Sequence, residues 1–379
     1  MTDLNNTEAG KRSLFKKVGY AVLGLLIFRL LPGTPPRAVA RRTENSGSAS
    51  PPSKSTDTSL AEAKQSGRGR EAESPTEIPA LGWKDIGLRA FDEMNRHRLL
   101  AVAGGVAYFG LLALFPAIAA LVAIYGLFAD RGTINDHLAA LYGLFPAGAV
   151  DVIGEQVKRI ASKGNTTLGF AFFFGLVISL WSANSGMKAL FDALNVAYGE
   201  EEKRSFISLN LLTLLFTIGS IVFVLAALGA IVVIPALLSL MGFGDLLDWL
   251  LWAARWPALL VAIVVVLAIV YRFGPSRKGA QWRWITPGSL LAAFFWVAFS
   301  MLFSWYVANF GNYNETYGSL GAVIGFMTWM WLSVLIILVG AELNAELEHQ
   351  TAKDTTIGAE KPIGSRGAHV ADTIGAARA

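Results

Sequence analysis

Long apolar runs, each about the length of a membrane crossing, alternate with short polar connections over residues 99–341. A transmembrane helix needs roughly 20 mostly apolar residues, because each residue advances the helix by about 1.5 Å and the hydrocarbon layer is about 30 Å thick. This pattern predicts six spans, at about 99–128, 167–188, 206–235, 257–271, 286–308 and 319–341. We therefore expect an all-α fold, a polytopic membrane bundle of six transmembrane helices.

In two shorter stretches, apolar residues recur every three or four positions, as on one face of a helix, but the stretch is too short to span a membrane. Before the first span, this spacing along 82–98 predicts an amphipathic elbow helix on the membrane surface. The same spacing within 129–166 predicts a helical outer loop. The hydrophobic segment 18–31 is short, contains Arg29 and has basic residues on both flanks. We interpret it as a surface-lying or poorly inserted helix, with a seventh crossing as the alternative.

Composition divides the chain into three parts. Residues 1–81 form an N-terminal extension that is predicted to be mostly disordered, because 43–80 is rich in Ser, Gly, Pro, Glu and Lys and cannot bury a core. Residues 82–348 form the six-span membrane domain. The tail 349–379 has a similar polar composition and is predicted to be a disordered cytoplasmic tail.

Basic residues are distributed unequally between the two sets of connections. The flank 82–98 and the second-to-third and fourth-to-fifth connections together hold ten: Lys84, Arg89, Arg96, Arg98, Lys203, Arg204, Arg272, Arg277, Lys278 and Arg283. The alternate connections hold five: Arg131, Lys158, Arg159, Lys163 and Arg255. The positive-inside rule therefore predicts that the N and C termini are both cytoplasmic. Six crossings agree with this, because an even number places both termini on the same side.

The overall composition excludes several kinds of chemistry. The chain has 379 residues and is only 16% charged, whereas soluble domains average about 25%. Without cysteine it has no disulfides, thiolate metal sites or cysteine nucleophiles. Its four histidines are scattered without ligand spacing, so we expect no metal and no cofactor. The net charge of +4 reflects topology, so no nucleic acid is expected as a partner.

The second span ends in a polar stripe with helical spacing that includes Asn184, Lys188, Asp192 and Asn195. Lys188 and Asp192 are four residues apart, where opposite charges can pair on a helix. Each charge buried in lipid would cost about 2.5–3.5 kcal/mol, so the stripe indicates a polar cavity or path. In the alternative interpretation, Lys188 lies at the membrane interface and extends its ammonium group into water.

The last span ends with Glu342, Asn344 and Glu346, which lie within about one helical turn. Close carboxylates can bind protons or cations, although acidic residues at a helix exit are also commonly solvated. A basic residue such as Lys188 or Arg272 would be a suitable partner from another helix. The predicted set for a polar cavity or translocation path is Asn184, Lys188, Asp192, Asn195, Arg272, Glu342 and Asn344.

The connection 271–284 is compact, because Gly274 and Pro275 favour a turn, and it is rich in cations and tryptophan. Such a loop beside the bilayer suits anionic lipid headgroups. The predicted headgroup residues are Arg277, Lys278, Trp282 and Arg283. Ordinary topological anchoring is the alternative.

Five segments occur together in a characteristic order and spacing: "AYFGLLALFPAI" (107–118), "NVAYGEEEKRSF" (195–206), "YRFGPSRKGAQWRWITPGS" (271–289), "YNETYGSLGAVIGFMTWMWLS" (313–333) and "LVGAELNAEL" (338–347). In them the chain resembles the YihY/virulence factor BrkB family of bacterial inner-membrane proteins, whose members have also carried the name ribonuclease BN. The resemblance covers about 82–348. It implies a six-span inner-membrane protein without a settled reaction.

Three functional hypotheses follow. The first is a transporter or translocator of a lipid or small molecule with a role in the cell envelope, with membrane lipids as partners. The second is a non-catalytic envelope scaffold or partner-binding membrane protein. The third, a ribonuclease, is disfavoured because phosphodiester hydrolysis usually needs a metal cluster or an acid–base pair. We assign no catalytic residue and expect no enzymatic activity.

Overall fold

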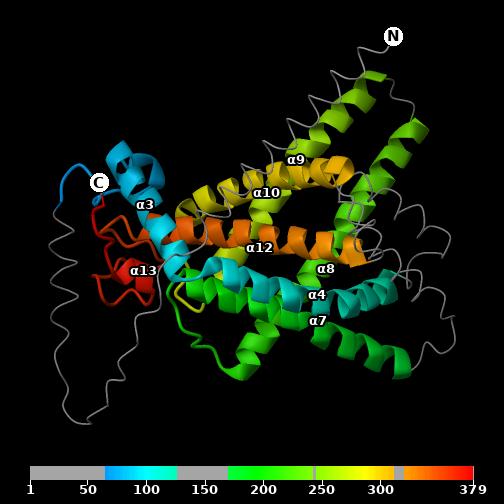
Figure 1. Ribbon diagram of the computed structural model, residues 1–379, viewed down its shortest axis with the longest axis horizontal. Helices are drawn as coiled ribbons and strands as arrows, with labels where there is room; N and C mark the ends of the chain where they lie inside the picture. Colours follow the sequence, from blue (N-terminus) through cyan, green and yellow to red (C-terminus); the bar gives the residue numbers. More distant parts are fainter. Residues whose placement is uncertain (1–64, 126–169, 242–244, 311–319, 379) are drawn as a thin grey trace, which may run out of the picture. The chain divides into compact units, whose positions relative to one another are not determined.

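The computed structural model describes residues 65–125, 170–241, 245–310 and 320–378, and Figure 1 shows helices in all four ranges. In chain order the helices are η1 (Pro75–Glu77), α3 (Ala80–Arg96), α4 (Leu99–Tyr125), α7 (Phe170–Ala197), α8 (Phe206–Met241), α9 (Asp245–Phe273), α10 (Trp282–Phe310), α12 (Leu320–Glu348) and α13 (His369–Asp372). Within these ranges the only β-type pairing is one isolated bridge between Ala280 and Thr356. The all-α prediction is confirmed for the described residues.

Four described helical segments are long and apolar enough to cross a membrane: Leu99–Ile118, Phe206–Ala227, Trp282–Asn309 and Val323–Glu348. A shorter apolar segment, Pro257–Phe273, accompanies them. These segments coincide with five of the predicted spans, and the count of six stays a prediction. The predicted outer loop at 129–166 and the segment 18–31 lie outside the described residues.

Large apolar side chains are exposed along α8 and α10, among them Phe206, Ile207, Leu211, Leu215, Phe294, Leu302 and Trp305. A water-facing surface would rarely expose so many apolar side chains in a row. Inside a bilayer the same side chains contact lipid, while helices satisfy their own backbone hydrogen bonds. The exposed faces therefore agree with a membrane setting.

Helix α12 packs against both α10 and α4, and α4 in turn packs against α7 (Figure 1). Small residues permit this close packing. A Cβ on Gly186 of α7 would lie 3.1 Å from the Ala113 Cβ of α4. Because other helices pack on several sides of α12, the polar side chains near its C-terminal end are buried.

The predicted elbow helix is present as α3, and it joins α4 through a sharp turn. Helix α3 ends at Arg96, and Arg98 has a φ of 54°, in the left-handed region that is uncommon for residues other than glycine. The chain therefore cannot continue as one helix, and α4 begins at Leu99. This joint leaves His97 at the end of α3, beside α12.

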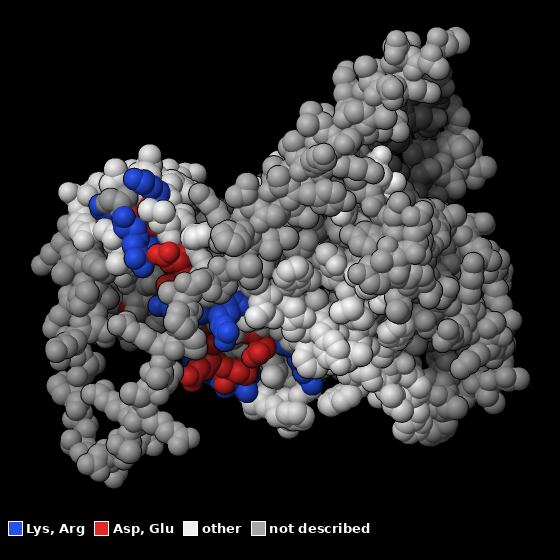
Figure 2. Space-filling model, viewed as in Figure 1, with Lys and Arg blue, Asp and Glu red and all other residues white. Residues whose placement is uncertain are grey.

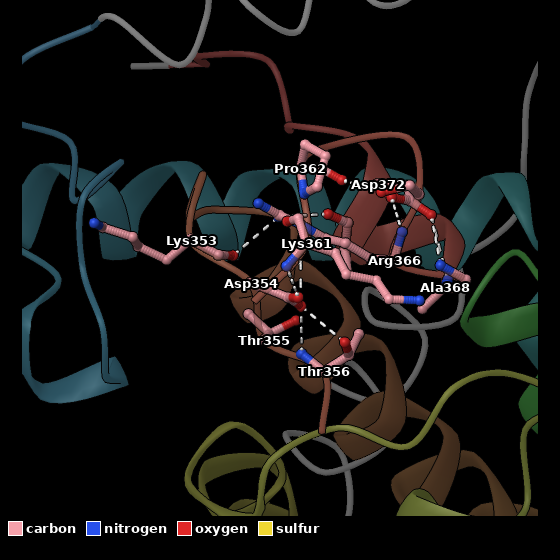
Figure 3. Close-up of polar contacts among 12 residues, drawn as sticks. Lys353, Asp354, Thr355, Thr356, Lys361, Pro362, Arg366, Ala368 and Asp372 are labelled. Carbon is pink, nitrogen blue, oxygen red and sulfur yellow. Dashed lines mark hydrogen bonds and ion pairs between the residues drawn. The ribbon is translucent and has the colours of Figure 1, made fainter. Parts of the chain in front are cut away.

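The C-terminal tail differs from the predicted disorder, because residues 350–378 fold around the buried side chain of Arg366 (Figure 3). Its guanidinium group donates to the backbone carbonyl oxygens of Ala352, Lys353, Lys361 and Ala371. Asp372 accepts hydrogen bonds from backbone N–H groups, including those of Gly364 and Gly367. These side chains satisfy backbone groups that a regular helix or sheet would otherwise satisfy.

Residues 65–79, which the sequence assigned to the mostly disordered extension, also pack against this tail. Arg70 donates to the carbonyl oxygens of Gln350 (3.1 Å) and Gly375 (2.7 Å). Ala72, Ile78 and Ile86 share a small apolar cluster with Trp284 and Leu347. The ordered domain therefore begins earlier and ends later than the predicted 82–348.

Candidate functional site in the polar base

Charged and polar side chains gather where α7, α9 and α12 end and α4, α8 and α10 begin, as Figure 2 shows for the described Lys, Arg, Asp and Glu residues. We call this region the polar base. It consists of the ends of these helices, the connections 198–205 and 274–281, helix α3 and the tail 349–378. Most of the predicted cavity residues lie here, so the base is the candidate functional site.

Asn195, near the end of α7, holds two connections together. Its Oδ1 accepts a hydrogen bond from the backbone N–H of Ser276 (2.7 Å), and its Nδ2 donates to Glu202 (3.1 Å). The Arg204 side chain, which hydrogen-bonds Glu202, lowers the pKa of Glu202 to about 2. Asn195 therefore fixes loop geometry in this structure.

Asn344, on α12, contacts the first turns of α10 where the backbones of the two helices lie close together. Its Oδ1 accepts a hydrogen bond from the N–H of Gly288 (2.8 Å), directly after Pro287. A Cβ on Gly288 would collide with the Gly340 carbonyl and with Asn344, and a Cβ on Gly340 would lie 2.6 Å from the Tyr271 hydroxyl. These two glycines are therefore required for α10 and α12 to pack at this distance.

Glu342, also on α12, is buried and forms a hydrogen-bonded ion pair with the Nδ1 of His97 (3.2 Å). On the other side of the imidazole ring, the Nε2 of His97 lies 3.7 Å from Glu93. The hydrogen bond to Glu342 raises the pKa of His97 above its usual value. His97 is not among the site residues predicted from the sequence, because it lies 245 positions from its partner.

These three side chains have the composition of a cation site. Glu93, His97 and Glu342 each offer one ligand atom, and the ligand atoms all lie within 4.8 Å of one another. One imidazole with two carboxylates suits a divalent transition metal, although Arg96 also contacts Glu93 (2.6 Å) and competes for it. The cluster can therefore serve either as a proton-carrying network or as a metal site.

Arg277, a predicted headgroup residue, lies inside the base instead. Its guanidinium group forms a two-point ion pair with Glu348 (3.0 and 2.6 Å), and the paired side chains are 2% and 0% exposed. The same group lies 5.2 Å from the ring centroid of Tyr198, and burial raises the pKa of that tyrosine. A neutralised and enclosed Arg277 cannot contact lipid, so we remove it from the headgroup set.

The other headgroup residues remain near the surface. The Arg272 guanidinium stacks on the Trp282 ring, 4.2 Å from its centroid. Arg283 is exposed and donates to Gln281 (2.8 Å), and Lys278 is half-buried. The structure therefore brings Arg272, which the sequence placed in the cavity set, together with the headgroup residues.

The upper part of the predicted stripe has different contacts. Asn184 is buried, and its Oδ1 accepts from the Thr217 hydroxyl (3.4 Å). Lys188 lies over the rings of Trp181 (5.2 Å) and Phe206 (6.0 Å), whereas Asp192 is exposed. Among the described residues no ion pair joins Lys188 to Asp192, and their role in a path stays a prediction.

Comparison with known proteins gives consistent matches. The family model described as virulence factor BrkB matches residues 90–363. A ribonuclease-like protein, YfkH, of Bacillus subtilis (strain 168) is 34% identical over 261 residues, covering 68% of this chain and 93% of that protein. A UPF0761 membrane protein of Haemophilus influenzae (strain 86-028NP) is 22% identical over 278 residues, covering 71% and 97%. No solved structure matches.

Proposed function

This chain belongs to the virulence factor BrkB family, and we propose that it is a multi-pass inner-membrane protein that moves a small molecule or a lipid across the bilayer. The apolar helices and the membrane-protein relatives support the membrane setting. The bias of Lys and Arg among the connections supports cytoplasmic termini.

One observation carries the translocation proposal. Asn184, within α7, is 0% exposed, and its amide Nδ2 has no hydrogen-bond partner among the described residues. Leaving such a donor unsatisfied costs about 1–3 kcal/mol, and hydrocarbon offers no acceptor. Polar groups buried within membrane helices therefore commonly face a water-filled interior or a bound ligand. A wet interior beside α7 would satisfy Asn184 and provide a passage.

A lipid flux assay tests this function. Purified protein is reconstituted into phosphatidylcholine vesicles with a trace of fluorescent phosphatidylglycerol, and dithionite, which does not cross bilayers, bleaches the outer leaflet. We expect the protein to expose inner-leaflet label as well. Replacing the buried amide (Asn184→Leu) should slow that phase, whereas the matched exposed change Asn309→Leu should not. Bleaching that matches empty vesicles would count against lipid translocation.

The alternative, a scaffold without flux, makes a different prediction. It expects one stoichiometric partner to co-purify from gently solubilised membranes, with no movement of lipid. The ordered tail 350–378 and the connection 198–205 would then be the natural contact surfaces, because both belong to the polar base and contact each other through His369 and Glu200. Flux without a partner favours the translocator.

We also propose that the chain is not a nuclease, although one relative carries a ribonuclease-like name. In the described part of the chain, Glu346 is paired with Arg89 (2.5 Å) and Glu348 with Arg277 (2.6 Å), which leaves these carboxylates poorly placed as general bases. Purified protein should leave RNA intact. Cleavage that disappears in Glu342→Gln would overturn this proposal.

A further inference from the structure

Arg272, in the last turn of α9, is a cation without a counter-charge among the residues that the structure describes. Its Nε and Nη1 atoms are both enclosed and have no hydrogen-bond partner in the described part of the chain. Neighbouring arginines are neutralised, since Arg277 pairs with Glu348 and Arg204 with Glu202. An enclosed guanidinium group without an acceptor is costly, so an anionic ligand would stabilise it.

The position of Arg272 indicates what kind of anion reaches it. The residue ends the apolar segment Pro257–Phe273 and lies beside the start of the candidate span Trp282–Asn309. Its two aromatic neighbours, Phe273 and Trp282, are 46% and 49% exposed. Exposed tryptophan at the end of an apolar helix is typical of the headgroup level of a membrane. An anion at this level belongs to a lipid.

The chemistry of the side chains indicates a phosphate group. Stacking on the Trp282 ring fixes the plane of the Arg272 guanidinium, which presents parallel N–H donors suited to phosphate oxygens. Lys278, on the connection 274–281, and Arg283, in the first turn of α10, add positive potential. Trp282 is 49% exposed, so part of it can contact acyl chains or the glycerol region.

We propose that Arg272, held by Trp282, binds the phosphate of an anionic lipid headgroup at the membrane-facing edge of the polar base. Lys278 and Arg283 contribute long-range attraction, and Arg277 contributes none because Glu348 neutralises it. The site does not depend on translocation, because a tightly held structural lipid would use the same contacts.

The test uses full-length protein, delipidated in neutral detergent, and follows thermal unfolding with added lipid. Phosphatidylglycerol should raise the unfolding temperature, whereas phosphatidylcholine should not. Arg272→Gln should weaken the phosphatidylglycerol response about tenfold or more, the loss expected for one charge-assisted hydrogen bond. Arg283→Gln, which removes one exposed cation of the same loop, should retain most of it.

Two further measurements distinguish a lipid phosphate from free phosphate, and ligand binding by Arg272 from a purely structural role of this residue. Inorganic phosphate at the same concentration should have little effect, and equal stabilisation by it would overturn the lipid assignment. Arg272→Lys keeps the charge but loses the planar guanidinium, so its stabilisation by phosphatidylglycerol should be intermediate. This variant replaces Arg272→Gln in the test if Arg272→Gln does not fold. Equal phosphatidylglycerol responses in Arg272→Lys, Trp282→Leu and the wild type would overturn the proposal, whatever the flux assay shows.

Discussion

The polar base and the middle of α7 both bury polar side chains, but the base pairs buried carboxylates with basic side chains and leaves the Nε and Nη1 donors of Arg272 without a partner among the described residues. In the base, Arg89 contacts Glu346 at 2.5 Å and Arg277 contacts Glu348 at 2.6 Å. On α7, Asn184 keeps an amide donor without a partner among the described residues. Most buried charges of the polar base therefore hold helix ends together. A ligand or water is expected instead where a buried donor has no partner within the protein.

The largest effect should follow from breaking a buried ion pair in the base. Glu348→Gln leaves the Arg277 guanidinium uncompensated and replaces one of the two carboxylate oxygens that accept from Arg277 and Thr355 by an NH2 donor. We expect a loss of about 3–5 kcal/mol in the free energy of unfolding, measured by denaturation in detergent. Asp192→Asn, at an exposed position on α7, should change it by less than about 0.5 kcal/mol. Equal effects would remove the contrast between the two regions.

The folded tail provides the next test. Arg366→Leu removes four hydrogen bonds to backbone carbonyl groups and should destabilise residues 350–378 by about 1.5–3 kcal/mol. Limited proteolysis should then cleave the tail faster. Arg378→Leu, whose side chain is 49% exposed, is the matched control and should leave cleavage unchanged. A wild-type tail that is cut as fast as the variant would indicate that Arg366 does not hold it.

A smaller effect is expected at the crossing of α10 and α12. Gly288→Ala would force a methyl group against the Gly340 carbonyl and should cost about 1–3 kcal/mol of stability. Gly105→Ala, where a Cβ meets no described atom within 4 Å, should be neutral or slightly stabilising. Thermal unfolding of the two variants measures the difference. Similar unfolding temperatures would contradict the close approach at Gly288.

The smallest predicted effect is a pH dependence of stability from His97. Its pKa is raised on folding, so its stabilisation is fully present below its unfolded pKa of about 6.5 and is lost as pH rises through the raised value. The groups that face it are Glu93, Arg96 and Glu342. His97→Gln should flatten the decline in stability with rising pH above neutrality. An unchanged profile would show that His97 does not titrate against Glu342.

Much of the architecture was predictable because it depends on local sequence. Runs of about 20 apolar residues identified helices that are long and apolar enough to cross a bilayer, and the helical spacing of apolar residues before Leu99 identified α3. The tail was not predictable, because its order comes from one arginine binding distant backbone carbonyl groups, and composition does not record such contacts.

The candidate site was predictable only in part. Asn195, Arg272, Glu342 and Asn344 were selected from polar positions at helix ends, and all four lie in the polar base. Their partners were not selected, since Ser276, Trp282 and His97 meet them only after the helices pack. The exchange of roles between Arg277 and Arg272 has the same origin, because only packing determines which cation meets Glu348.

The central claim, that incomplete hydrogen bonding on α7 indicates a wet interior, is tested most directly by thiol accessibility. The chain has no cysteine, so Asn184→Cys introduces a single thiol, with Asp192→Cys as the exposed control and Ala292→Cys as the buried apolar control. In sealed vesicles, a membrane-impermeant thiol reagent should label Asn184→Cys and Asp192→Cys but not Ala292→Cys. Asn184→Cys that stays as unreactive as Ala292→Cys would contradict the account.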